Sequence, residues 1–382
     1  MKKIALIIIT FFVYVSCAQT DGKNVNASNP TYLPGDFGFR SLTANEKNYY
    51  SEEIKKFYDT NFLQKGFNGS ILVAKNGQIL FEDYHGIMNF ETGEPITEHT
   101  PFHLASISKT FTGMTILKLW EEGRISLEDS LQKFFPALPY HNITIKMLLS
   151  HRSGLPNYLY FMDSVWNKKQ KATNNDVVNF MIEHKPKINL PPGKAYNYSN
   201  TNFLLLASII EKITHESYPQ YMKDSVFIPL GLKDTYVFSA KDTLNYIPTL
   251  SVTKPFPMDH LDCTYGDKNI YSTVRDIFKW DSVLYTNTFL RKSTLQMAFQ
   301  PQSNEHKTMH NYGLAWHLYF NGGDTIVYHN GKWHGSNTSF TRLIQDTATI
   351  IMLGNKLNNN IYHAKDMSYI FTGRTDTTKL SE

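Results

Sequence analysis

A serine and a lysine three positions apart form the first group of residues whose types and spacing could do chemistry. Ser106 and Lys109 stand in the run Ser-Ile-Ser-Lys, at the start of an apolar helical pattern over residues 107–120. Residues three apart share one face of a helix, so the Lys109 amine can approach the Ser106 hydroxyl. An amine buried among apolar groups loses affinity for its proton and can then activate the serine as a nucleophile. The alternative is a helix cap followed by a solvated lysine.

A tyrosine and an asparagine two positions apart form the second group. Tyr198 and Asn200 lie in the loop-like stretch 192–201. In an extended loop, residues two apart point to the same side, so both side chains are expected to face one cleft. We expect a phenol close to a lysine ammonium to lose its proton well below the usual pKa of about 10 and to pass protons to a leaving group. Alternatively, Asn200 caps the helix that follows and Tyr198 only packs.

The third group begins with His329 and includes Gly331 and Lys332, within the run His-Asn-Gly-Lys-Trp-His-Gly over residues 329–335. A glycine beside an edge strand lets the backbone of a substrate come close. A neighbouring backbone N–H, together with that of Ser106, could form an oxyanion hole, which stabilises the charge that develops on a carbonyl oxygen under attack. An exposed histidine in a turn is the alternative.

In this order and with these separations, the three motifs resemble those of the serine β-lactamase and penicillin-binding-protein superfamily. The Tyr-x-Asn form of the second motif and the His of the third are similar to the branch that holds class C β-lactamases and DD-peptidases. Class C β-lactamases usually carry Lys at that position, and His is more typical of the DD-peptidase and esterase-like members. Further similar stretches are spread along residues 46–372, namely 123–129, 148–156, 271–276 and 312–316.

The resemblance implies a hydrolase that forms an acyl-enzyme on a serine, from an amide or ester substrate such as a β-lactam, a D-amino-acid peptide or a small ester. It assigns three catalytic roles: Ser106 as nucleophile, Lys109 as proton acceptor and Tyr198 as general base. It assigns substrate binding to Asn200, His329, Gly331 and Lys332. His329 would face a substrate carboxylate or assist Tyr198, and the backbone amide of Lys332 would join that of Ser106 at the oxyanion. The alternative function is a protein that binds penicillin or peptidoglycan fragments and is acylated slowly or not at all.

The elements that must position these residues change character along the chain. A helical pattern covers 46–62, and two β-rich runs, 69–74 and 78–84, flank an Asn-Gly turn that indicates a hairpin. Short β-rich runs return at 313–319, 339–344 and 349–353, whereas residues 106–285 are mostly helical in pattern, with clear helices at 203–213 and 277–284. We therefore expect an α/β (α+β) fold of the β-lactamase/transpeptidase-like kind. Its antiparallel sheet would come from both chain ends, with flanking helices and a large helical insertion lobe.

The amino terminus predicts the compartment. Lys2 and Lys3 precede the uncharged run 4–15 and then Ser16-Cys17, which is typical of a secretory signal peptide over residues 1–16. The run is too short for a membrane-spanning helix, which needs roughly 20 residues. The stretch ending at Cys17 resembles a bacterial lipobox, so we expect Cys17 to be lipidated and residues 17–44 to form a flexible tether to a single hydrolase domain over 45–382. This predicts a cell-envelope protein, anchored on the periplasmic side or the surface. An ordinary signal peptide with an incidental cysteine is the alternative.

Composition excludes several other classes of protein. Hydrophobic residues make up 41% of the 382 residues and charged residues 19%, which is typical of a folded globular chain. The formal charge of +4 is not gathered into basic blocks, so no nucleic-acid partner is expected.

His306 and His310 have the spacing of metal ligands but no helical pattern, so we expect no metal and no cofactor. Cys263 is expected to be a buried small side chain. The expected partners are a small-molecule or peptide substrate and the membrane, with the protein itself a monomer.

Overall fold

The computed structural model describes residues 39–306, 308–321 and 324–373. The predicted signal peptide 1–16, the lipidation site Cys17 and most of the tether 17–44 lie outside the described residues. No helix in the described ranges combines the length and apolar character that crossing a bilayer requires.

One seven-stranded antiparallel sheet joins the two ends of the chain, in the order β2-β1-β12-β11-β10-β9-β8. Its strands are β1 (Gly69–Lys75), β2 (Gln78–His85), β8 (His310–Tyr312), β9 (His317–Asn321), β10 (Asp324–Trp333), β11 (Ser336–Leu343) and β12 (Ala348–Gly354). Strand β1 pairs with β12 from Gly69 opposite Gly354 to Lys75 opposite Ala348, which confirms the expectation that both ends build one sheet. The hairpin between β1 and β2 is also confirmed, because Asn76 and Gly77 both have positive φ, at 49° and 66°.

The strands near the third motif differ from the sequence prediction in two ways. The predicted strand 313–319 is interrupted, because Ala315 has φ of 69° and the N–H groups of Leu314 and Ala315 donate to carbonyls outside the sheet. Strand β9 therefore begins only at His317. Strand β10, the longest in the described sheet, is not predicted at all, because the polar residues of the third motif break its apolar alternation. Pairing with β11 along eight residues, from Ile326 to Trp333, holds it in the sheet despite that weak local signal.

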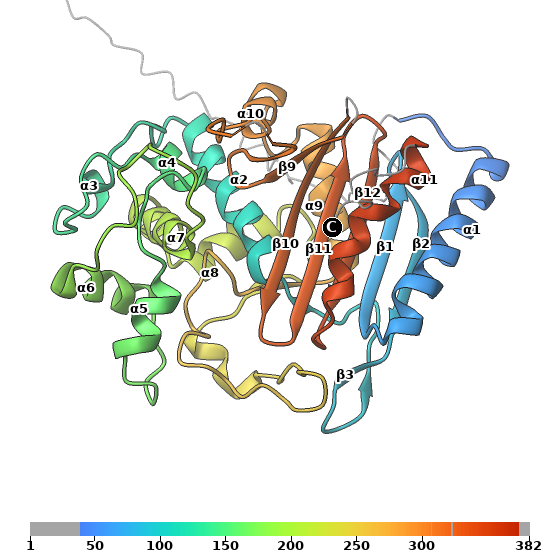
Figure 1. Ribbon diagram of the computed structural model, residues 1–382, viewed down its shortest axis with the longest axis horizontal. Coiled ribbons are helices and arrows are strands. Elements are labelled where there is room, and N and C mark those ends of the chain that lie inside the picture. The colour runs from blue at the N-terminus through green and yellow to red at the C-terminus, as the bar shows by residue number, and fades with distance from the viewer. Residues whose placement is uncertain (1–38, 307, 322–323, 374–382) are drawn as a thin grey trace, which may run out of the picture.

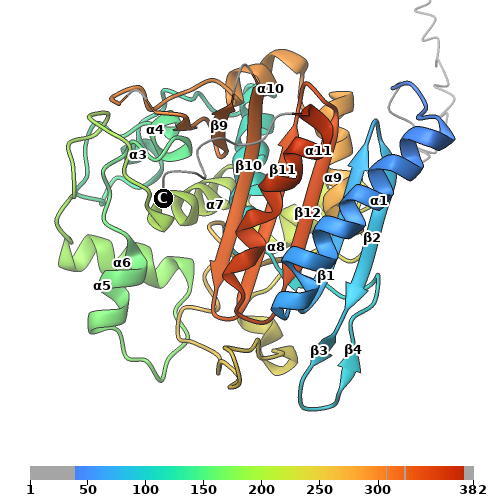
Figure 2. The same cartoon turned by 45° about the vertical axis from the view of Figure 1, so that its right-hand side comes forward.

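Helices cover both faces of the sheet, as Figures 1 and 2 show. On one face lie α1 (Ala44–Asn61), the 3-10 segment η5 (Asn359–Met367) and α11 (Ser368–Thr372), and on the other lie α2 (Ser108–Glu121) and α9 (Val274–Thr286). Side chains along β1 alternate between the two cores: Ile71 and Val73 pack with the first set, and Leu72 with the second. The sheet is thus the middle of three layers, which explains why its central strands are buried.

The middle of the chain forms the helical lobe at the left of Figure 1. Its helices are α3 (Leu131–Phe134), α4 (Ile145–Leu149), α5 (Tyr158–Val165), α6 (Asn174–His184), α7 (Asn200–Thr214), α8 (Tyr218–Tyr221) and the π-helical η3 (Met222–Phe227), with α10 (Lys292–Ala298) near β9. Short elements complete the chain: η1 (Leu63–Lys65), η2 (Ala105–Ile107), η4 (Ala240–Asn245), β3 (Ile87–Asn89), β4 (Glu94–Pro95), β5 (Phe102–His103), β6 (Tyr236–Val237) and β7 (Ile270–Ser272). This architecture confirms the predicted mixed fold with a helical insertion. Helix α2 contacts α7 and so connects the lobe to the sheet.

A buried ion pair ties α9 to the sheet. The Arg342 guanidinium on β11 donates to the Asp281 carboxylate on α9, and only 1% and 2% of these side chains are exposed. Thr349 on β12 also donates to Asp281, and the guanidinium lies 4.6 Å from the Tyr285 ring centroid. Two strands and one helix therefore depend on one pair of buried charges.

We expect Arg342→Ala to lower the free energy of unfolding by about 3 to 5 kcal/mol, because it leaves the Asp281 charge buried without its partner. Denaturant unfolding followed by circular dichroism measures the change. Lys133→Ala is the matched control: it removes an ion pair with Asp129 whose lysine is 55% exposed, and should cost about 0 to 1 kcal/mol. Equal losses in the two variants would contradict the structural role of the buried pair.

Candidate active site

Ser106 lies on a tight turn between the short strand β5 and helix α2. It is the middle residue of η2, and it is half-buried while its neighbours are buried. Ala105 just before it has φ of 48°, a left-handed conformation that non-glycine residues rarely adopt. The turn is held in place because the Ala105 N–H donates to Nδ1 of His103 at 3.1 Å and the Leu104 N–H donates to the Ile270 carbonyl at 2.8 Å. The backbone thus presents the Ser106 hydroxyl at the start of a buried helix.

The Lys109 amine is completely buried beside that hydroxyl. Its Nζ donates to Ser106 Oγ at 2.9 Å, to Asn200 Oδ1 at 2.8 Å and to the backbone carbonyl of Asp267 at 2.8 Å. Burial lowers the pKa of Lys109 to about 7. The predicted approach of the lysine to the serine is confirmed, and the alternative of a solvated lysine is excluded.

Tyr198 reaches Ser106 from the helical lobe. Its hydroxyl donates to Ser106 Oγ at 3.0 Å, and it stands two residues before Asn200, the first residue of α7. The His151 ring lies 4.2 Å from the Tyr198 ring, centroid to centroid, and His151 Nδ1 accepts the Ser199 N–H at 3.2 Å. The prediction that Tyr198 and Asn200 face the same side is therefore confirmed, since Tyr198 bonds Ser106 and Asn200 bonds Lys109. Asn200 does not cap α7, whose first residue it is.

The expected loss of the Tyr198 proton is wrong for this site. Burial raises the pKa of the Tyr198 phenol above its usual value, although the hydrogen bond with Ser106 opposes the rise. The expectation assumed a full ammonium on Lys109, but the same burial disfavours that charge too. Lys109 is consequently the group whose proton is exchanged most easily near neutral pH, and Tyr198 is a hydrogen-bond donor.

Strand β10 forms the opposite wall of the site, and alternate residues share one of its faces. His329, Gly331 and Trp333 lie on the face toward η2. A Cβ on Gly331 would stand 2.4 Å from the Leu104 carbonyl and 2.3 Å from Thr338 Oγ1, so glycine is required by packing of the strand against the serine turn. This differs from the predicted reason, which was close approach of a substrate. Lys332 is exposed on the other face, so only its backbone can take part at the site.

His329 is buried in the strand, so the alternative of an exposed histidine in a turn is excluded. Its Nδ1 donates to the Asn330 carbonyl at 2.8 Å, which leaves Nε2 to accept from the Tyr312 hydroxyl at 3.3 Å. Burial holds the pKa of His329 well below its usual value, so the ring is neutral. Within the described residues these two hydrogen bonds do not join His329 to Tyr198, so assistance to Tyr198, one of its two predicted roles, has no direct contact behind it.

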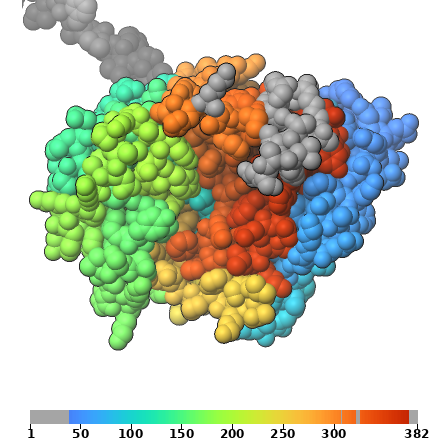
Figure 3. Space-filling view, viewed as in Figure 1, coloured from blue at the N-terminus to red at the C-terminus, as the bar shows by residue number. Residues whose placement is uncertain are grey.

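Among the described strands, β10 has a paired strand on one side only beyond Tyr328. Strand β9 pairs with residues 324–328 and stops, whereas β11 pairs on to Trp333. The edge of residues 329–333 is therefore open toward the site. Figure 3 shows the surface hollowed where the helical lobe, in green, meets the orange strands.

Two functional contributors escape sequence reasoning. The Asp267 carbonyl is a backbone group, which no residue type reveals. Tyr312 lies in one of the stretches similar to the superfamily but belongs to none of the three motifs.

Cys263 is buried as expected, and burial raises the pKa of its thiol. The described residues contain no group of three or more His, Cys, Asp or Glu arranged to hold a metal ion.

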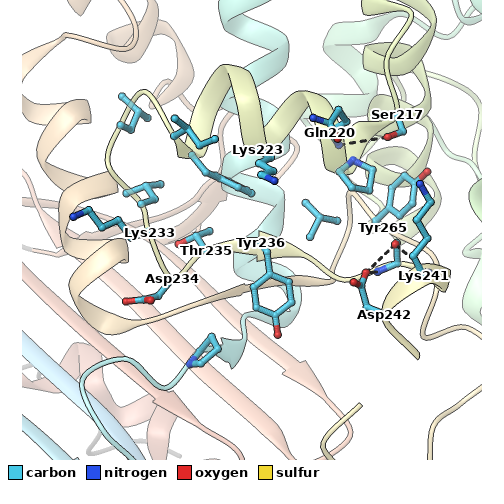
Figure 4. A pocket seen from close by; sticks show the side chains of 18 of the residues that line it. Ser217, Gln220, Lys223, Lys233, Asp234, Thr235, Tyr236, Lys241, Asp242 and Tyr265 are labelled. Atoms are coloured by element: carbon cyan, nitrogen blue, oxygen red, sulfur yellow. Dashed lines mark hydrogen bonds between the residues drawn. The ribbon is translucent and has the colours of Figure 1, made fainter. Parts of the chain in front are cut away.

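A large cavity of 1110 Å³ lies elsewhere, under α8 and η3 (Figure 4). Lys223, Tyr236 and Lys241 are on its walls, and Cys263 lines it too. None of Ser106, Lys109, Tyr198 or Asn200 borders it, so this cavity is separate from the serine.

A serine hydroxyl shared by a buried lysine and a tyrosine, at the junction of an antiparallel sheet and a helical lobe, defines a serine enzyme of the acyl-transfer type. Comparison with known proteins agrees with this class. Residues 61–371 match the Beta-lactamase family. The chain is 30% identical to penicillin-binding protein 4* of Bacillus subtilis, over 81% of this chain and 73% of that protein. The chain therefore belongs to the β-lactamase family, in the superfamily of serine hydrolases that includes penicillin-binding proteins.

Other relatives and solved structures support the same fold. Protein flp of Staphylococcus aureus is 30% identical over 70% of this chain, and the chain spans only 56% of that protein. The penicillin-binding protein of Bacillus halodurans superposes with a TM-score of 0.72 at 22% identity, covering 83% of this chain and 98% of its own. The D-amino acid amidase of Ochrobactrum anthropi SV3 gives 0.68 at 20% identity, over 86% of this chain and 98% of its own.

We expect the rate at which a fluorophosphonate labels Ser106 to rise with pH, with a midpoint near the lowered pKa of Lys109, about 7. The reason is that only the neutral amine can take the Ser106 proton, and its fraction grows as pH rises. Lys109→Met should slow labelling by about 100-fold or more. Lys118→Met, in the last turn of the same helix with a side chain that is 36% exposed, should leave the rate unchanged. A labelling rate that stays constant from about pH 5 to about pH 9 would contradict the role of Lys109.

Proposed function

We propose that this protein is an extracytoplasmic hydrolase that cleaves an amide or ester through an acyl-enzyme on Ser106. The observation that supports it most directly is that two groups share the Ser106 oxygen, Lys109 Nζ at 2.9 Å and Tyr198 Oη at 3.0 Å. Lys109 takes the proton as Ser106 attacks the carbonyl carbon. The backbone amides of Ser106 and Lys332 then hold the oxyanion.

The proton on Tyr198 gives this residue a defined part in the cycle. As the tetrahedral intermediate collapses, Tyr198 donates its proton to the leaving amine or alcohol and regains one from Lys109. Water then attacks the ester carbonyl of acylated Ser106, and its proton passes to the Tyr198–Lys109 pair. The acid leaves, and the Ser106 hydroxyl is restored. Asn200, which accepts from Lys109 at 2.8 Å, keeps the amine aligned and offers its amide N–H to the substrate.

The neutral His329 favours particular acyl donors. His329 is the first residue of the third motif, at the position where class C β-lactamases usually carry Lys, and its ring is held uncharged by burial. A neutral ring gives little attraction to a substrate carboxylate. We therefore propose that the preferred substrates are small esters and D-amino-acid amides, which carry no carboxylate, and that β-lactams are turned over slowly. The shared fold with a D-amino acid amidase supports this preference.

A panel of substrates tests the reaction. Purified protein is incubated with nitrocefin, p-nitrophenyl acetate, D-phenylalanine amide and a D-Ala-D-Ala peptide, and with a fluorescent penicillin as an active-site label. We expect ester or D-amino-acid amide turnover that Ser106→Ala abolishes, with nitrocefin hydrolysis at least about 100-fold less efficient in kcat/KM. Fast nitrocefin hydrolysis would overturn the substrate preference. Penicillin labelling without turnover of any substrate would instead favour a penicillin-binding sensor.

We further propose that lipid on Cys17 anchors the enzyme to the bacterial envelope. The support is the sequence pattern of residues 1–17 alone. In cells that make the full chain, we expect the protein in the detergent-extracted membrane fraction, and Cys17→Ser in the aqueous fraction. Cys263→Ser is the matched control, since that thiol is buried in the domain, and should stay with the membrane. A Cys17→Ser protein that remains membrane-bound would refute the anchor.

A further inference from the structure

Residues 262–270, here called the bridging segment, contact both walls of the active site. The Asp267 carbonyl accepts from Lys109 at 2.8 Å. On the other side, Asp262 accepts from Nε1 of Trp333 on β10 at 2.6 Å. Asn269 bonds His103, which holds the serine turn, at 2.8 Å. One short segment thus touches the base, the serine turn and the open strand.

Two adjacent side chains of this segment are charged and buried. Asp267 is 1% exposed and Lys268 3% exposed. The Tyr158 hydroxyl lies between them, donating to the Asp267 carboxylate at 3.0 Å and accepting from Lys268 Nζ at 2.6 Å. Lys268 Nζ also stands 4.9 Å from the centroid of the Trp333 ring. Buried charges are costly unless they are paired or hydrogen-bonded, and the reaction described above uses neither of these.

We propose that Asp267 and Lys268 are positioning residues for the reaction at Ser106, and that the Asp267 carboxylate stabilises the protonated form of Lys109. This inference rests on the proposed function. Through Tyr158 the two charges lock the bridging segment, so that the Asp267 carbonyl stays aimed at Lys109. Through the Trp333 ring, Lys268 supports the end of β10 that borders the site.

The negative charge of Asp267 acts in one direction on the protonation of Lys109. A nearby negative charge favours an ammonium, and Asp267 accordingly raises the pKa of Lys109 against the larger effect of burial. The other titratable groups that face Lys109 are Tyr198, His151, His317, His329 and Lys268. Burial lowers the pKa of all three histidines, that of His317 to about 4, and raises that of Tyr198. The histidines and the tyrosine are therefore uncharged near neutral pH, and Asp267 supplies the negative charge.

The test is the pH profile of kcat/KM for the best substrate of the panel. Asp267→Asn keeps the backbone carbonyl and an acceptor for Tyr158 but removes the charge. We expect the midpoint of its acid limb to fall by about one pH unit, since the ammonium of Lys109 loses its stabilising neighbour. Asp276→Asn is the matched control: this carboxylate is equally buried, on α9, and bonds Lys279 and Thr235. Its midpoint should not move.

Lys268→Met separates the charge effect from general loosening of the segment. It breaks the same network at Tyr158 but removes a cation, so it should raise KM without lowering the midpoint. If Asp267→Asn does not fold, Asp267→Ser also removes the charge and carries the same expectation. An unchanged midpoint in the folded Asp267 variant, or the same downward shift in Lys268→Met, overturns the inference. A wild-type protein with no Ser106-dependent activity would instead refute the proposed function, so the two failures are distinguishable.

Discussion

The Lys109 amine loses its hydration when α2 packs between the sheet and the helical lobe, and the surrounding structure must compensate for that loss. The lowering of its pKa from 10.5 to about 7 corresponds to about 5 kcal/mol lost by the ammonium relative to the amine. Three hydrogen-bond acceptors, from three separate parts of the chain, satisfy the nitrogen. A buried amine with a proton that is easily exchanged, fixed against a serine, is what the proposed chemistry requires.

The architecture follows from the need to bring those acceptors together. Ser106 comes from the turn before α2, Asn200 from the start of α7 in the helical lobe, and the Asp267 carbonyl from the bridging segment. The sheet supplies a rigid wall, because its strands are covered on both faces and β10 packs directly against the serine turn at Gly331. Small movements between lobe and sheet would separate the acceptors, so packing across this junction protects the geometry of the site.

The character of the site is less polar than its motifs suggest. His329 and Tyr312 are buried and bond to each other, and aromatic and imidazole rings surround Tyr198 and Lys109. Such surroundings exclude water and strengthen the hydrogen bonds at Ser106. They also hold Tyr198 and His329 in their uncharged forms, which decides which group exchanges protons and what kind of substrate is attracted.

The sequence by itself determined the sheet from both chain ends, the β1–β2 hairpin, the buried helix after Ser106 and the pairing of Tyr198 with Asn200 on one side of a loop. These follow from local periodicity, turn residues and spacing, which act over a few residues. It could not determine strand β10, whose polar motif hides its pattern, nor the interruption near Ala315, where the backbone bonds distant carbonyls. It was also wrong about the charge on Tyr198. Only the tertiary structure decided which groups are buried. Burial, produced largely by segments that are distant in the sequence, sets the protonation of Lys109, Tyr198 and His329.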